Sequence, residues 1–113
     1  MVTIEAARKI ALSFEGSNEE PHFEKASFRV KKKIFATMDE EKQQIIVKLS
    51  EMDQSVFSGF DRKIIYPVPG AWGRQGWTIL ELKKIKKEIF ETVLTASYCQ
   101  VAPIKLAEKY RQK

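Results

Sequence analysis

The sequence lacks several features that would mark a particular class of protein. It contains one cysteine, so it can form neither an internal disulfide nor a two-cysteine metal site. That residue, Cys99, falls in an apolar helical stretch, which favours a buried and unreactive thiol. The sequence has none of the motifs of serine hydrolases, zinc peptidases, P-loop proteins or dinucleotide-binding proteins. No apolar run approaches the roughly 20 residues of a membrane-spanning helix.

What is present has the composition of an ordinary globular domain. Apolar residues make up 43% of the chain and charged residues 31%. A chain of 113 residues is long enough for one two-layer core, so we expect residues 1–113 to form one domain. The net charge of +5 permits binding to nucleic acid without requiring it. The first residues predict an amphipathic helix and not a signal peptide, which favours the cytoplasm.

Alternation of apolar and polar residues with period two predicts an antiparallel sheet. Ala26, Phe28 and Val30 alternate with polar neighbours, as in a half-buried strand. Short polar segments connect this stretch to the next two, as in a meander of hairpins. The predicted strands comprise approximately residues 26–30, 34–38, 45–49, 64–66 and 77–82. About five strands with helices packed on one face make an α+β fold.

Helical spacing predicts four helices beside this sheet. Thr3 is placed to cap the first helix. Ser50 is placed to cap a short helix in which Met52, Val56 and Phe57 are expected to face the core. The predicted helices comprise approximately residues 4–14, 51–58, 83 up to the break at Pro103, and 104–110.

The stretch from residue 66 to residue 77, called the glycine loop below, concentrates residues that constrain the backbone. It contains two of the four prolines, three of the five glycines and both tryptophans. Pro67 and Pro69 lack amide donors, so the segment cannot lie inside a central strand. A loop of this kind that carries Trp72 and Trp77 either binds a partner or closes the core.

Motifs spread over nearly the whole chain resemble those of one family. They are Glu20-Pro21-His22-Phe23, Ser27-Phe28-Arg29-Val30, Lys33-Ile34-Phe35-Ala36, Tyr66-Pro67-Val68-Pro69 followed by Trp72-Gly73 and Gly76-Trp77, and Val101-Ala102-Pro103 with Leu106-Ala107. In this order they resemble the MmcQ/YjbR-like family of small bacterial proteins. The resemblance implies a fold related to the frataxin/CyaY class and a proposed double-wing mode of DNA binding.

The resemblance supplies no catalytic residue, and the chain departs from the frataxin class in one respect. Iron handling in that class is associated with an acidic ridge on the first helix and the following strand. Here the first helix carries only Glu5 and Glu15, with Glu19 and Glu20 in the loop that follows, and Arg8 and Lys9 oppose them. We therefore expect no iron site, and no other metal or cofactor.

The first functional hypothesis is non-catalytic binding of double-stranded DNA. Lys31, Lys32 and Lys33, approached by Arg29, place positive charge on one predicted hairpin, where it can contact phosphates. Arg74, between the two tryptophans, offers a second contact with stacking capacity. A solvated turn is the alternative interpretation of the lysines, and closure of the core is the alternative for the tryptophans.

The second hypothesis is a small-anion or protein-interaction module built on the glycine loop. His22, Tyr66, Trp72 and Trp77 would converge on a pocket in which Arg74 binds an anion between aromatic walls. Enzymatic activity is a third hypothesis, because His22 follows Glu20 closely. A lone histidine is more often a structural hydrogen-bonding group than a general base, so we expect no enzyme.

A second basic segment, Lys83, Lys84, Lys86 and Lys87, opens the predicted long helix. Cations near a helix N-terminus oppose the macrodipole, so these lysines do not serve helix stability. They mark either an anion-binding surface or a solvated face.

Overall fold

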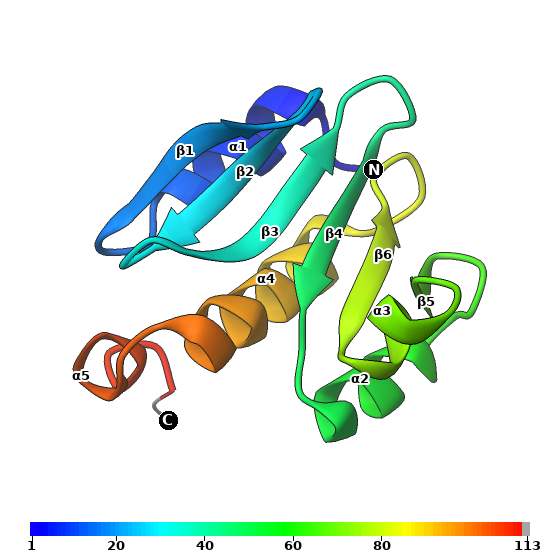
Figure 1. Cartoon of the computed structure of the whole chain (residues 1–113). Helices are drawn as coiled ribbons and strands as arrows, with labels where there is room; N and C mark the ends of the chain where they lie inside the picture. The colour runs from blue at the N-terminus through cyan, green and yellow to red at the C-terminus, as the bar shows by residue number, and fades with distance from the viewer. Residues whose placement is uncertain (112–113) are drawn as a thin grey trace.

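The computed structural model describes residues 1–111, in which six strands form one antiparallel sheet (Figure 1). The strands are β1 (Ser17–His22), β2 (Lys25–Val30), β3 (Lys33–Asp39), β4 (Gln44–Lys48), β5 (Ile65–Pro67) and β6 (Trp77–Glu81). Their order in the sheet is β1-β2-β3-β4-β6-β5. The first four strands form the predicted meander, and β6 then pairs with β4.

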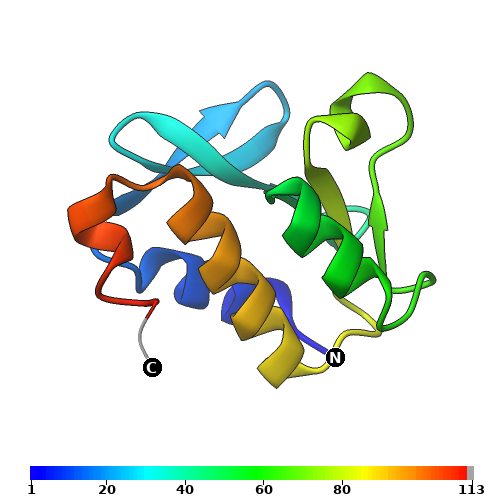
Figure 2. The same cartoon turned by 90° about the horizontal axis from the view of Figure 1, so that it is seen from below.

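Five helices accompany the sheet in residues 1–111. They are α1 (Ile4–Leu12), α2 (Glu51–Ser58), α3 (Ala71–Arg74), α4 (Lys87–Val101) and α5 (Ile104–Ala107). Figure 2 shows α1 and α4 on one side of the sheet and α3 on the opposite side. None of the helices within residues 1–111 combines the length and apolar character needed to cross a membrane.

The core lies between the sheet and the pair α1 and α4. Its centre includes an aromatic cluster in which Phe14 stacks on Tyr98 with ring centroids 4.8 Å apart, and Phe35 meets Tyr98 edge-on at 5.6 Å. Burial raises the pKa of Tyr98 to about 12, and its hydroxyl donates to the carbonyl of Glu15. Cys99 is also buried, and burial raises the pKa of its thiol, as expected of a structural cysteine.

The predicted α+β fold is confirmed, but several element predictions need correction. The helix α3 was not predicted, because its four residues lie in the glycine loop. The strand β1 was not predicted, because Ser17–His22 is polar and lies exposed at the edge of the sheet. The long helix begins at Lys87 and not at Lys83, because the backbone of Lys86 is extended, with φ of −78° and ψ of 146°, and separates the turn at residues 82–84 from α4.

The short helix α2 has the predicted bounds, and its predicted orientation is partly wrong. Ser50 caps it as expected, since its hydroxyl accepts from the Asp53 amide at 3.1 Å. Phe57 is buried, but Met52 is 75% exposed and Val56 is 53% exposed. A single helix face cannot bury positions 52, 56 and 57 together here, because the contact with β5 uses the face that carries Phe57.

Candidate functional site: a groove on the outer face of the sheet

The outer face of the sheet, opposite α1 and α4, is apolar at its centre. Thr37 on β3 pairs with Ile46 on β4, which pairs in turn with Ile79 on β6. These residues alternate along each strand with core residues such as Met38 and Val47, so their side chains lie on the opposite face. An antiparallel sheet with one solvated face normally carries polar residues there. A group that covers the apolar centre would therefore shield it from water.

A groove of about 790 Å³ lies over this apolar centre and is called the outer-face groove below. Its lining residues are His22, Phe23, Glu24, Lys25, Ile34, Thr37, Ile46, Val68, Trp72 and Trp77. The volume lies within the range of roughly 300–1,000 Å³ typical of ligand sites. Residues of the β1–β2 turn form one wall, and residues of the glycine loop form the other.

The first wall presents an unusually exposed aromatic ring. Phe23 is 91% exposed and makes an edge contact with His22, with ring centroids 4.8 Å apart. It has φ of 60°, at the first position of a two-residue turn. Glycine is the usual residue where a hairpin turn requires positive φ, so a bulky side chain here strains the backbone. The ring is held in solvent beside the groove at a conformational cost.

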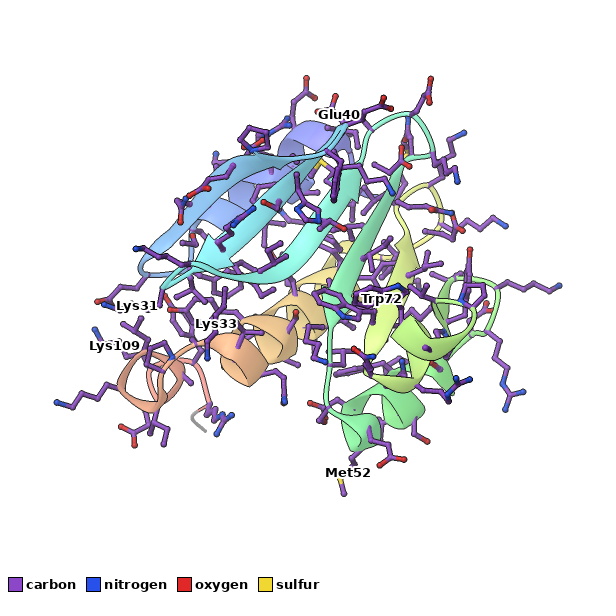
Figure 3. All side chains as sticks on the ribbon, viewed as in Figure 1. Lys31, Lys33, Glu40, Met52, Trp72 and Lys109 are labelled. Carbon is purple, nitrogen blue, oxygen red and sulfur yellow. The ribbon has the colours of Figure 1, made fainter. Side chains whose placement is uncertain are left out.

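The opposite wall depends on two glycines that no other residue can replace without movement. A Cβ at Gly73 would lie 1.9 Å from the Val68 carbonyl oxygen, and one at Gly76 would lie 2.0 Å from the Leu49 carbonyl oxygen. This close packing places α3 against the end of the sheet. Trp72 on α3 is 62% exposed and lines the groove, whereas Trp77, which also lines it, is partly buried. Figure 3 shows where Trp72 lies on the molecule. The loop thus both closes the sheet end and displays an aromatic ring.

Hydrogen bonds fix the second wall to the rest of the fold. The Gln54 amide nitrogen on α2 donates to the Gly73 carbonyl at 2.9 Å and to the Thr78 hydroxyl at 3.1 Å. Lys48 donates to the Gln75 carbonyl, and its ammonium lies 5.6 Å from the centroid of the Trp77 ring. These contacts preorganise the groove in the absence of a ligand.

Of the five residues predicted to form a pocket, the structure brings three together. His22, Trp72 and Trp77 line the groove, whereas Tyr66 and Arg74 are not among its lining residues. The Tyr66 hydroxyl donates instead to Glu81, which also accepts from Gln44 at 2.9 Å. The hydrogen bond to Glu81 is the main cause that raises the pKa of Tyr66 to about 12. Tyr66 therefore joins the edge strand β5 to β6.

The predicted basic hairpin is the turn between β2 and β3, and its three lysines are called the lysine turn below. Lys31 and Lys32 have φ of 51° and 71°, the backbone that a type I′ turn normally gives to Asn-Gly. All three lysines are exposed, and the ion pairs within residues 1–111 include none of them. Figure 3 shows Lys31 and Lys33 at the end of the molecule that also carries Lys109.

The two arginines of the DNA hypothesis do not join the lysine turn. Arg29 is half-buried, and its Nε donates to the Ser27 hydroxyl at 3.0 Å and lies 3.9 Å from a Glu20 oxygen. Arg74 is exposed on α3, across β3 and β4 from the lysine turn (Figure 1). The residues predicted to contact DNA therefore do not form one continuous surface.

Comparison with known proteins supports the resemblance seen in the sequence. The family model described as YjbR matches residues 12–100, most of the chain. The chain belongs to the YjbR family. A similar solved structure is the crystal structure of Deinococcus radiodurans protein DR2400, described by the domain DUF419, with a TM-score of 0.77 and 18% identity. The match covers 88% of this chain and 78% of that one, and at this identity it shows the fold alone. No curated protein matches the chain.

Sequence reasoning missed seven of the ten residues that line the groove in this YjbR-family chain. Its apolar floor includes Ile34 and Ile46, and Phe23 and Val68 complete the walls. A signal for the floor was present, because Ile46 stands at a position of β4 where alternation calls for a polar residue. Phe23 carried no such signal, since its exposure follows from the turn conformation.

Two acidic residues of this YjbR-family protein, Glu19 and Glu40, form ion pairs with Arg8. The Arg8 guanidinium donates to Glu19 at 3.0 Å and to Glu40 at 2.8 Å, and the hydrogen bonds to these carboxylates raise the pKa of Arg8. The two contacts tie α1 to β1 and to the turn after β3. In residues 1–111, no group of three or more His, Cys, Asp or Glu side chains is arranged to hold a metal ion.

Proposed function

We propose that this protein is a non-catalytic binding module that accepts a flat, mostly apolar group in the outer-face groove. One observation carries the proposal. The groove has an apolar floor and an exposed aromatic side chain on each wall, Phe23 and Trp72. Rings placed on both sides of an apolar floor suit a flat ring inserted between them.

The energetics of these side chains support the same conclusion. Burying one exposed aromatic side chain contributes roughly 1.5–3 kcal/mol. Much of this gain offsets the loss of freedom on binding. The two charged lining residues, Glu24 and Lys25, cancel formally, and Lys25 lies 3.9 Å from Asp39. A neutral aromatic or apolar group is therefore favoured over a polyanion in this groove.

A fluorescence titration with anilinonaphthalene sulfonate, an aromatic probe of apolar sites, tests the proposal. We expect saturable binding to the wild type and at least a tenfold weaker affinity in Trp72→Ala. The variant should remain folded, because Trp72 is mostly exposed and its removal should cost less than about 1 kcal/mol.

Val56→Ala is the matched control, because Val56 is also exposed but lies on α2, outside the groove. Its affinity for the probe should equal that of the wild type. Equal binding by Trp72→Ala and the wild type, or a loss of binding in Val56→Ala, would overturn the proposal.

We propose a second binding activity, for double-stranded DNA, at the lysine turn. Its support is that lysines occupy two positions where the backbone favours asparagine and glycine, so their charge is kept at a conformational cost. A projecting hairpin with three exposed cations suits contact with phosphates. This candidate concerns a different surface from the groove.

Fluorescence anisotropy of a labelled random-sequence duplex tests this second candidate, first at low and then at physiological salt. Binding should weaken with salt, with a slope of about 0.9 for each phosphate contacted. Replacing Lys31, Lys32 and Lys33 by Gln should weaken binding about tenfold at low salt. The control replaces Lys83, Lys84 and Lys86 by Gln, which removes the same charge elsewhere. Equal losses in both triple variants would reduce the effect to net charge and reject the lysine turn as the site.

A further inference from the structure

Lys109, which follows α5, lies at the same end of the molecule as the lysine turn (Figure 3). Its ammonium is 2.5 Å from a carboxylate oxygen of Glu15. Ser17, two residues after Glu15, pairs with Val30 of β2, and Val30 directly precedes the lysine turn. These contacts bring Lys109 and the lysine turn to one end of β2, although they are far apart in the sequence.

Backbone contacts on both sides hold this ion pair in place. The Glu15 amide donates to the Tyr110 hydroxyl at 3.0 Å. Leu106 on α5 packs at Gly16, where its Cδ1 would lie 3.5 Å from an added Cβ, an ordinary van der Waals distance. The side chains of Lys109 and Glu15 are nevertheless 56% and 51% exposed. Both charges are therefore accessible to a ligand that binds at this end of the molecule.

A phosphate can replace the carboxylate in this ion pair. Exposed ion pairs contribute little to stability, because water and salt screen them. A phosphate oxygen accepts the same charge-assisted hydrogen bond from an ammonium as a carboxylate oxygen does. The hydrogen bond to Glu15 raises the pKa of Lys109, so the ammonium is charged at neutral pH. Exchange of one anion for another at Lys109 thus needs no change in protonation.

We infer that Lys109 is a phosphate contact of the bound duplex, and that Glu15 limits the affinity by holding Lys109 in the free protein. This inference rests on the proposed binding of double-stranded DNA at the lysine turn. When the duplex binds, a backbone phosphate takes the place of the Glu15 carboxylate at the Lys109 ammonium. The contact surface then comprises the lysine turn and the segment that follows α5.

Fluorescence anisotropy of the labelled random-sequence duplex, measured at a series of salt concentrations, tests the inference. Lys109→Gln should weaken binding several-fold at low salt and lower the salt slope by about 0.9, the value for one lost phosphate contact. Glu15→Gln should strengthen binding several-fold, because Lys109 is then free to meet the duplex. Both variants break the same ion pair, so a purely structural role of the pair would change the affinity in the same direction in both.

The neighbouring residues Glu41 and Lys42 provide matched controls for net charge. Both are exposed in the turn after β3, at the opposite end of that strand from the lysine turn. Glu41→Gln and Lys42→Gln should each change the affinity by less than twofold. Lys109→Arg keeps the positive charge and should bind as tightly as the wild type.

The outcomes separate this inference from the DNA proposal on which it rests. Suppose the triple lysine-turn variant loses affinity, but Lys109→Gln and Glu15→Gln shift it no more than the two controls or shift it in the same direction. The lysine turn would then remain the site, and the inference would be rejected. A wild type that binds no duplex at low salt would reject both.

Discussion

The glycine loop and the lysine turn meet the same backbone requirement in opposite ways. Both contain residues with positive φ, Gly70 and Gly76 in the loop and Lys31 and Lys32 in the turn. In the loop glycine stands where the left-handed backbone requires it, and close packing excludes a side chain at Gly76. In the turn two long side chains occupy positions that cost roughly 1–2 kcal/mol each for a residue other than glycine.

The difference indicates what each region contributes. Where the backbone dictates the residue, as at Gly76, the sequence serves the fold, and the loop holds the wall of the groove in place. Where an exposed side chain stands at a strained backbone position, we interpret the strain as a sign of function. Phe23 belongs to this second group, since its φ is 60° and its ring is 91% exposed. Of the four non-glycine residues with positive φ in residues 1–111, Phe23, Lys31 and Lys32 lie at the two proposed binding surfaces, whereas Gln43 lies in the turn between β3 and β4, outside both.

The largest effect should come from Gly76→Ala. The new Cβ would meet the Leu49 carbonyl oxygen at 2.0 Å in a left-handed backbone, so we expect a loss of at least about 3 kcal/mol in the free energy of unfolding. Chemical denaturation measures this loss. Gly70→Ala is the control, since it has positive φ but no atom within 4 Å, so it meets backbone strain of roughly 1–3 kcal/mol without a clash and should cost less than Gly76→Ala. Equal losses would show that packing against Leu49 is unimportant.

A smaller effect of opposite sign should come from Lys31→Asn combined with Lys32→Gly. Asn-Gly suits the turn, so the free energy of unfolding should rise by about 1–2 kcal/mol. Duplex binding should weaken in the same variant, which separates stability from function. A variant that is no more stable than the wild type would remove the argument from strain at the lysine turn.

The substitution Phe23→Gly tests the argument from backbone strain at the β1–β2 turn. Glycine adopts positive φ without strain, and the exposed Phe23 ring contributes little packing that would be lost. The free energy of unfolding should therefore rise by about 1 kcal/mol. Affinity for anilinonaphthalene sulfonate should fall several-fold, since one wall of the groove is lost. Unchanged affinity would limit the binding site to the Trp72 side.

The smallest effect should be that the Tyr66 phenol ionises at a higher pH than an ordinary tyrosine. Its pKa is about 12 in the folded protein against about 10 in the unfolded chain, so the folded state binds more protons between these values. The stabilisation is complete below pH 10 and declines as pH rises towards 12. Ultraviolet absorbance of tyrosinate should show one fewer late-titrating phenol in Tyr66→Phe. The same number of late phenols in the variant would contradict the hydrogen bond to Glu81.

The sequence predicted the fold better than it predicted the site, for physical reasons. Periodicity located β2, β3 and β4 because their core residues alternate, whereas β1 has no apolar face to reveal it. The predicted start of α4 was wrong because Lys83 and Lys84 are compatible with a helix, and the sequence gives no signal for the extended backbone of Lys86 that separates them from α4. The intrinsic helix propensity of a residue is thus overruled where the rest of the fold determines its backbone conformation.

The groove shows the same limit of prediction from sequence. His22, Trp72 and Trp77 were predicted as pocket residues, and the structure places all three in its lining. Ile34 and Ile46 lie beside them only through strand pairing and sheet twist, which the sequence does not specify. Tyr66 was expected in the pocket, but its hydroxyl reaches Glu81 on the neighbouring strand.

The most direct test of two separate binding surfaces is amide NMR mapping on the wild-type protein. Spectra are recorded during one titration with anilinonaphthalene sulfonate and another with the DNA duplex. We predict that the aromatic probe shifts amides of Thr37, Ile46 and Trp72, and that the duplex shifts those of Lys31, Lys32 and Lys33. Shifts by both probes at one common surface, or by the aromatic probe on α2 alone, would contradict the account.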